Sequence, residues 1–310
     1  MKILIYGAGV IGSLFAAKLQ AAGHEVTVLA RGERLRDLIE HGLIVINAGS
    51  GARLACPART IERLAPDDRF DLTIVPVQRA QLAAILPVLQ EHDGTGDILV
   101  MSNNPSGLAE LTRALGGRVM AGFPGAGGGK EGPEIHYMLA PSILQPTTIG
   151  EIDGRLTPRV RRIAAILRRA GLPTAVTRKM DAWQKTHVAW VSPLANALYG
   201  AGGSNYALAG DRRMLRLAIE GTREGFRVLA RLGVPIAPFR LRFWQAVPLP
   251  VLVFVLGKIM RTKFAETVVA RHANAAREEM RLLAEEFRLL AAEAGIAAPA
   301  LDKLQSYIKL

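Results

Sequence analysis

The sequence contains very little cysteine, since Cys56 is the only one among 310 residues. One cysteine cannot form an intramolecular disulfide, and it excludes metal clusters that are held by several thiolates. Spacing of the zinc-finger type is missing as well, so we expect no bound metal. A chain that does not depend on disulfides is typical of a reducing compartment, and we therefore expect it in the cytoplasm.

Long apolar runs are also missing. The most apolar window, Ala246–Met260, is shorter than the roughly 20 residues that cross a bilayer, and it contains Pro248 and Pro250. At the N-terminus, Lys2 precedes an apolar run of about five residues, which is shorter than the apolar core of a signal peptide. We therefore expect no membrane partner. Residues 246–260 are predicted to form a buried helix or, alternatively, the interface of a homodimer.

Acidic residues are fewer than basic ones, 27 against 39, which gives a net charge of +12. This excess suits either a nucleic acid or an anionic small ligand. The basic residues are spread along helical faces, as in residues 157–171, where Val160, Ile163 and Leu167 form the apolar stripe. The aromatic ladder of RNA-binding modules is missing. We therefore expect a small anionic ligand and no nucleic acid.

Strand-like and helical segments alternate through the first half of the chain. Residues 2–7 and 25–31 have strand patterns with a helical pattern between them, and strand-like runs follow at 70–77, 96–104 and 118–124. Such alternation predicts an α/β fold with a doubly wound parallel sheet of the Rossmann type.

The strand signal stops after about residue 178. Residues 280–295 carry apolar side chains at helical spacing and end on Gly295, a helix stop signal. We therefore predict a Rossmann domain over residues 1–178 and an all-helical domain over residues 179–310. Within the first domain, residues 122–132 are predicted to be a glycine-rich loop.

The segment GAGVIG, residues 7–12, follows the first strand directly and opens a helix. In this context the glycines allow a tight turn, a close approach to pyrophosphate and a close contact between helix and strand. The helix N-terminus adds amide donors for the phosphates. We predict a dinucleotide site, with an unoccupied glycine turn as the alternative. Its predicted residues are Gly7, Gly9, Val10, Ile11 and Gly12.

The end of the second strand indicates which dinucleotide is bound. Sites for NAD usually have an acidic residue there, whereas this chain has Ala30 and Arg31. Arg31 can pair with a 2′-phosphate, and Arg34 is a possible second cation. We therefore predict NADPH as cofactor. The alternative is that both arginines only belong to a basic surface.

Three later motifs resemble those of the ketopantoate reductase (2-dehydropantoate 2-reductase) family. VMSNNPSGLAEL places Asn103 at the end of a strand, WQKTHVAWVSPL contains Lys185, and Glu279 lies sixteen positions before Gly295 of GIAAP. The resemblance covers essentially the whole chain. It implies NADPH-dependent reduction of a small 2-oxo acid or related ketone in pantothenate biosynthesis, with Lys185 as proton donor, Glu279 and Asn103 at the catalytic centre, and a helical domain for substrate binding and dimerisation.

The resemblance also assigns cofactor and substrate contacts. It implies that Asn103 binds the cofactor, as does Gln78, which stands where the family has a lysine. Thr267 and Asn205 are implied to bind substrate. Ala189 and Ser192 occupy the helical face on which the family has two asparagines, so the substrate contacts here differ from those of the family. His187 and His272 are predicted to be surface or packing residues. Site residues named by the resemblance are therefore Asn103, Lys185 and Glu279 for catalysis, and Ala189, Ser192, Asn205 and Thr267 for substrate.

Reduction of a ketone requires a proton donor near the carbonyl oxygen. Burial of Lys185 beside Trp183 or Trp190 would lower its pKa toward a useful range, while Glu279 would oppose this by stabilising the ammonium. Two alternatives remain at this point. One is a reductase for an imine or a bulkier ketone, and the other is a catalytically silent protein that senses NADP(H).

Overall fold

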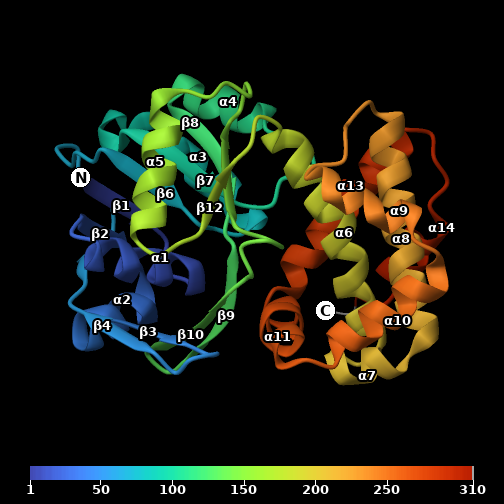
Figure 1. The fold of residues 1–310 in the computed structure, drawn as a ribbon. Coiled ribbons are helices and arrows are strands. Elements are labelled where there is room, and N and C mark those ends of the chain that lie inside the picture. The colour runs from blue at the N-terminus through green and yellow to red at the C-terminus, as the bar shows by residue number, and fades with distance from the viewer. Residues whose placement is uncertain (309–310) are drawn as a thin grey trace. The chain divides into compact units, whose positions relative to one another are not determined.

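The computed structural model describes residues 1–308, which divide into two compact units. Unit 1 comprises residues 1–102 and 108–180, and unit 2 comprises residues 103–107 and the chain from Asp181 onward. Unit 1 is built on a sheet with helices packed against it, whereas the long second part of the chain is helical (Figure 1). The predicted α/β class with a helical second part is therefore confirmed. The short segment 103–107 belongs to unit 2 although the chain around it belongs to unit 1.

The main sheet of unit 1 has the strand order β12-β11-β8-β7-β6-β1-β2-β5. Its pairs are parallel except for β8 with β11, which is antiparallel. Central strands such as β1 and β6 are buried along nearly their whole length, which explains their continuous apolar runs. The strands are β1 Lys2–Tyr6, β2 Glu25–Leu29, β5 Arg59–Ile61, β6 Leu72–Val75, β7 Asp97–Met101, β8 Val119–Phe123, β11 Thr147–Glu151 and β12 Thr174–Val176.

A second sheet in unit 1 has the order β4-β3-β10-β9. The predicted glycine-rich loop is wrong for residues 126–131, which form β9 and pair with β10. A Cβ at Gly128 would lie 2.1 Å from the His136 carbonyl oxygen, so glycine here permits a close approach of two backbones. The strands are β3 Leu43–Asn47, β4 Arg53–Cys56, β9 Ala126–Glu131 and β10 Glu134–Leu139.

The helices of unit 1 pack on these sheets. Helix α1 contacts β1 and β2 of the main sheet and β3, β9 and β10 of the second sheet, so most of its residues are buried (Figure 1). Helix α5 packs on β11 and β12. The helices are α1 Val10–Ala21, α2 Gly32–His41, α3 Arg79–Glu91, α4 Ala109–Leu115 and α5 Pro158–Arg169, with short 3₁₀ turns at Asp93–Thr95 and Gly116–Arg118.

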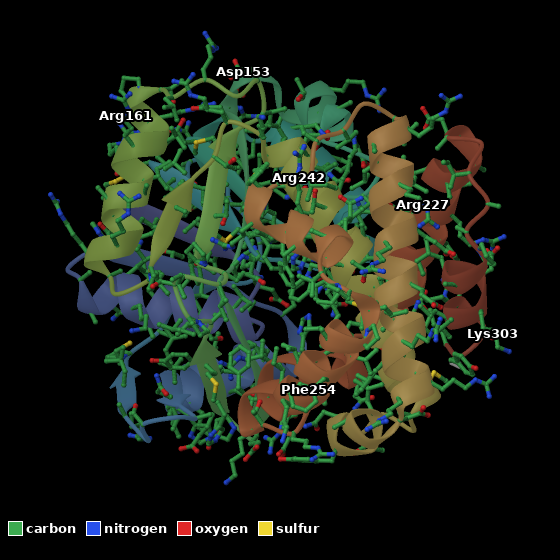
Figure 2. The ribbon with its side chains drawn as sticks, turned by 45° about the vertical axis from the view of Figure 1, so that its right-hand side comes forward. Asp153, Arg161, Arg227, Arg242, Phe254 and Lys303 are labelled. Carbon is green, nitrogen blue, oxygen red and sulfur yellow. The ribbon has the colours of Figure 1, made fainter. Side chains whose placement is uncertain are left out.

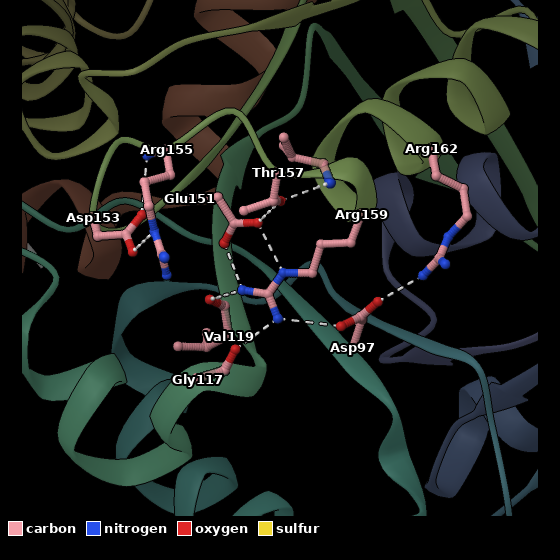
Figure 3. A network of polar contacts seen from close by, with 10 residues as sticks. Asp97, Gly117, Val119, Glu151, Asp153, Arg155, Thr157, Arg159 and Arg162 are labelled. Atoms are coloured by element: carbon pink, nitrogen blue, oxygen red, sulfur yellow. Dashed lines mark hydrogen bonds and ion pairs between the residues drawn. The ribbon is translucent and has the colours of Figure 1, made fainter.

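A buried ion-pair network joins α5 to the sheet (Figure 3). Glu151 at the end of β11 is 3% exposed and accepts hydrogen bonds from Arg159 and Thr157. Arg159 also contacts Asp97 at 3.2 Å and the Gly117 carbonyl oxygen at 2.6 Å. Burial alone would raise the pKa of Glu151, but the hydrogen bonds from Arg159 and Thr157 outweigh it and lower this pKa. The network satisfies a carboxylate that would otherwise be costly to bury.

Unit 2 is a set of packed helices around one core, in which Phe226 is fully buried. Helices α6 and α8 approach closely because glycines face the contact: a Cβ at Gly225 would lie 3.0 Å from Ala189 Cβ, and one at Gly221 would lie 3.3 Å from Pro193 Cβ. The helices are α6 Met180–Gly200, α7 Asn205–Gly210, α8 Arg212–Arg231, α9 Phe243–Ala246, α10 Leu249–Met260, α11 Lys263–Ala265, α12 His272–Ala275, α13 Arg277–Glu293 and α14 Pro299–Gln305, with a 3₁₀ turn at Phe239–Arg242 and a π-helix, η4, at Glu266–Arg271.

The predicted helix is present as α10, but it is buried on one face only. Leu252 and Leu256 face the core, whereas Phe254 is 66% exposed (Figure 2). Among residues 1–308, no single helix is long and apolar enough to cross a membrane. Residues 239–246 and 249–260 pass that test only as a pair bent by 120°. Basic residues such as Arg227 project from the helices, which agrees with a solvated basic surface (Figure 2).

Candidate active site

The glycine-rich turn after β1 fits a dinucleotide pyrophosphate. Gly7 has a φ of +114°, which side-chain-bearing residues rarely adopt. A Cβ at Gly12 would lie 1.9 Å from the Gly7 carbonyl oxygen, so only glycine allows this contact between helix and turn. A Cβ at Gly9 would meet nothing within 4 Å. No side chain caps α1, which leaves the amides of its first turn, including Val10 and Ile11, to a ligand.

The two arginines after β2 have different environments. Arg31 is exposed, precedes the first turn of α2 and donates from Nε to the Glu62 carbonyl oxygen at 3.3 Å. Arg34 is 13% exposed and donates to the Ala8 carbonyl oxygen and to Ser13 Oγ. Arg34 is therefore hydrogen-bonded to the glycine-rich turn. This placement does not favour its predicted role as a second cation for the 2′-phosphate. Arg31 keeps the exposure that such a role requires.

The segment Asn103–Gly107 follows β7 and lies along one face of α13. Asn103 Nδ2 donates to Glu279 Oε1 at 3.1 Å, and Ser106 Oγ donates to Glu286 Oε2 at 2.7 Å. Glu279 and Glu286 are seven positions apart, so they share one face of the helix. All four side chains belong to unit 2. Two hydrogen bonds thus attach this turn to α13.

Glu279 is a buried carboxylate at the start of a helix. Its side chain is in the first turn of α13 and the residue is 3% exposed. Amide groups at a helix N-terminus stabilise a negative charge, and the Asn103 amide adds a donor. Glu279 is thereby held in place as a hydrogen-bond acceptor.

Lys185 lies beside Gly107, at the end of the turn Asn103–Gly107 that is opposite Asn103. Its Nζ is 2.8 Å from Asp181 Oδ2, one helical turn earlier on α6, and its side chain is 16% exposed. A Cβ at Gly107 would lie 3.3 Å from Lys185 Nζ and 3.0 Å from Asp181 Oδ1. With a φ of +98°, Gly107 lets the backbone rest against this ion pair. The five-residue turn therefore contacts the Lys185 pair at one end and Glu279 at the other.

The tryptophans of α6 do not surround Lys185 as predicted. Trp183 and Trp190 lie about 160° and 140° around the helix from Lys185, because successive residues rotate by about 100°. Trp183 stacks on His187 at a centroid distance of 5.2 Å, and His187 contacts Trp190 at 6.1 Å. Burial, and then the charge of His272, lower the pKa of His187 to about 3. The aromatic residues thus form a packed face opposite the lysine.

The first part of the chain is similar to a known family. A family model for the ketopantoate reductase PanE/ApbA matches residues 3–154. Over these residues the chain is similar to the ketopantoate reductase family. As predicted, the chain is an oxidoreductase.

Several relatives of this reductase are known. The 2-dehydropantoate 2-reductase of Pyrococcus horikoshii is 27% identical over 249 residues, 78% of each chain, and that of Archaeoglobus fulgidus is 26% identical over 236 residues, 75% of each. The crystal structure of 2-dehydropantoate 2-reductase from Geobacter metallireducens has a TM-score of 0.78 at 20% identity and covers 99% of both chains. D-mandelate dehydrogenase with NADH and anilino(oxo)acetate has a TM-score of 0.78 at 16% identity and covers 99% of this chain and 97% of that one. These two structures share the fold of the reductase.

Two further residues assigned by the resemblance, Gln78 and Asn205, have local partners in the reductase. Gln78 is the N-cap of α3 and forms a reciprocal capping box with Gln81. Asn205 is 2% exposed and donates from Nδ2 to the Met260 carbonyl oxygen at 2.8 Å, which ties α7 to α10. Thr267 is half-buried in η4, a π-helix of the kind frequent at functional sites. Thr267 is therefore better placed than Asn205 to contact a substrate.

Ala189 and Ser192 are buried on α6. Ala189 is 1% exposed and packs against Gly225 of α8, so its position does not favour a substrate contact. Ser192 is 4% exposed and lies within about 20° of Lys185 around the helix. Asp181, the partner of Lys185, did not emerge from the sequence, although its spacing of four residues from a lysine was an available signal.

Proposed function

We propose that this reductase uses NADPH to reduce a small 2-oxo acid or a related ketone. The observation that carries the proposal is the turn Asn103–Gly107, which contacts Lys185 at one end and is hydrogen-bonded to Glu279 at the other. A proton donor and a hydrogen-bond acceptor are thus both held in unit 2 at fixed positions along one short segment. Carbonyl reduction requires such a pair beside the reacting group.

Each residue has a defined role in this proposal. The nicotinamide, when bound, supplies the hydride that adds to the carbonyl carbon. Lys185 Nζ donates the proton that the carbonyl oxygen gains, so that a ketone becomes an alcohol. Asp181 holds the ammonium in position through their 2.8 Å ion pair. Glu279 accepts a hydrogen bond from the substrate, and Asn103 keeps the carboxylate oriented.

The proposed substrate contacts are Ser192 and Thr267. Ser192 shares the helical face of Lys185, and Thr267 offers a hydroxyl from η4. Asn205 is hydrogen-bonded within the protein and Ala189 packs against α8, so few polar side chains remain to contact a substrate. This supports a 2-oxo acid other than ketopantoate. The predicted homodimer would use the exposed face of α10, and it stays a prediction, as does the cytoplasmic location.

The preference for NADPH is proposed to come from Arg31. Replacing Arg31 by alanine is expected to raise the Kd for NADPH by roughly tenfold or more and to leave the Kd for NADH unchanged, because a charged hydrogen bond to the 2′-phosphate contributes about 1.5–3 kcal/mol. Arg36→Ala is the control, since Arg36 is exposed on α2, the helix that Arg31 precedes. Titration of cofactor fluorescence measures both constants. Equal affinity changes for the two cofactors would contradict the 2′-phosphate contact.

A substrate panel tests the function itself. NADPH consumption, followed by absorbance, should be observed with 2-oxo acids, with ketopantoate included for comparison and imines and bulkier ketones as alternatives. Turnover confined to imines would replace the proposed reaction. Tight NADPH binding without consumption on the whole panel would instead support a sensing protein.

A further inference from the structure

The Ala8 carbonyl group in the glycine-rich turn is held by two donors. Its oxygen accepts hydrogen bonds from Ser13 Oγ at 3.0 Å and from Arg34 Nε at 3.1 Å. Arg34 Nη2 also donates to Ser13 Oγ at 3.0 Å, so the three groups form a closed ring of hydrogen bonds. Ala8 is 7% exposed and Ser13 is fully buried. Water therefore does not compete for these bonds, and the carbonyl group has one fixed direction.

The direction of this carbonyl determines that of the next amide. In a trans peptide the C=O and N–H groups point to opposite sides. Holding the Ala8 oxygen toward Ser13 and Arg34 therefore turns the Gly9 N–H away from them. Gly9 is exposed, and a Cβ there would meet nothing within 4 Å. The amide of this exposed glycine therefore points away from Ser13 and Arg34 at the start of α1, where pyrophosphate binds in this type of motif.

Arg34 is itself anchored by the second sheet. Its Nη1 donates to the Pro133 carbonyl oxygen at 3.1 Å, in the turn that joins β9 to β10. Asp37 lies 3.6 Å from Arg34 and 2.7 Å from Lys130 of β9. The guanidinium therefore has partners on the glycine-rich turn and on the second sheet. Each of its three nitrogens donates to an acceptor of the protein.

We propose that Arg34 is a positioning residue that sets the Ala8–Gly9 peptide for pyrophosphate binding and does not bind the 2′-phosphate. The inference rests on the proposed dinucleotide site. NADPH and NADH share the pyrophosphate and differ in the 2′-phosphate. Loss of Arg34 therefore weakens the binding of NADPH and of NADH by the same factor, whereas loss of Arg31 weakens the binding of NADPH alone.

Binding of three ligands to Arg34→Met tests this role. The Kd values for NADPH and NADH should both rise about tenfold, as expected when a hydrogen bond to a charged group is lost, and the Kd for adenosine 2′-monophosphate should not change. Arg36→Met is the matched control, because it removes one positive charge from an exposed position of α2. Ser13→Ala removes the other donor to Ala8 and should give a smaller, equally shared rise. Melting temperatures show that each variant is folded.

Three results would overturn the inference. The first is a greater loss of affinity for NADPH than for NADH in Arg34→Met, and the second is weaker binding of adenosine 2′-monophosphate by that variant. The third is an unchanged affinity for both cofactors in Arg34→Met and in Ser13→Ala. If Arg34→Met does not fold, Ser13→Ala decides the question alone. If the wild-type protein binds neither NADPH nor NADH, the proposed function fails, which is distinguishable from failure of the Arg34 role.

Discussion

Lys185→Met is expected to lower kcat by roughly 10²–10⁴-fold, the usual contribution of a positioned proton donor, while the Kd for NADPH stays unchanged. Methionine keeps much of the length of the side chain and removes the ammonium that pairs with Asp181. Stopped-flow measurement of NADPH oxidation with the best 2-oxo acid gives kcat, and titration gives the Kd. Lys179→Met is the matched control, because Lys179 is an exposed lysine just before α6.

The size of this loss separates a catalytic lysine from a structural one. Unchanged kcat in Lys185→Met would remove the residue from the mechanism. A loss of the same size in Lys179→Met would show that the effect is not specific to the site. Asp181→Asn keeps the ammonium but removes the charge of its partner, so it should lower kcat less than Lys185→Met does.

Acid should destabilise unit 2 through His187. Its folded pKa is about 3, against about 6.5 for an ordinary histidine, because burial and then the His272 charge disfavour the imidazolium. The unfolded chain therefore takes up a proton that the folded chain does not, and stability is lost as pH falls below about 6.5. This linkage amounts to about 1.4 kcal/mol per pH unit, or about 2.5 kcal/mol between pH 7.5 and 4.5. His187→Phe keeps a ring between the tryptophans and should weaken this dependence, while His272, whose pKa burial also lowers, retains its own share of it.

Tryptophan fluorescence during urea unfolding reports the pH dependence of the stability of unit 2, which contains His187. The three tryptophans of the sequence, Trp183, Trp190 and Trp244, all lie in unit 2. Glu151, whose pKa is also lowered, lies in unit 1 and does not contribute to this signal directly. An equal pH dependence in wild type and His187→Phe would show that His187 is not the group responsible.

The Rossmann part of the fold was predictable from local signals. The alternation of strands and helices and the glycines at positions 7, 9 and 12 depend on neighbouring residues, and the structure bears out both the sheet and the turn. The second sheet was not predictable, because β3 pairs with β10 from a distant part of the chain. Glycines 127–129 also weakened the strand signal of β9.

The residues of the candidate site were predictable from the sequence, but the contacts between their side chains were not. Lys185, Glu279 and Asn103 were named from their motifs. Trp183 was expected beside Lys185 because it is near in sequence, but the helical rotation places it on the opposite face. Arg34 was expected to meet a phosphate, and its guanidinium instead holds the Ala8 carbonyl oxygen. Proximity in sequence does not determine which groups meet after folding.

By itself the sequence determined the glycine-rich turn after β1, since three glycines within six positions permit this tight backbone wherever the rest of the chain lies. Only the tertiary structure decided the partners of the catalytic candidates. Asn103 reaches Glu279 across 176 positions of the sequence, and Gly107 rests on the Lys185–Asp181 pair. These contacts arise because one turn after β7 packs on α6 and α13, which lie far from it in the sequence, and such packing is a property of the folded unit rather than of any local pattern.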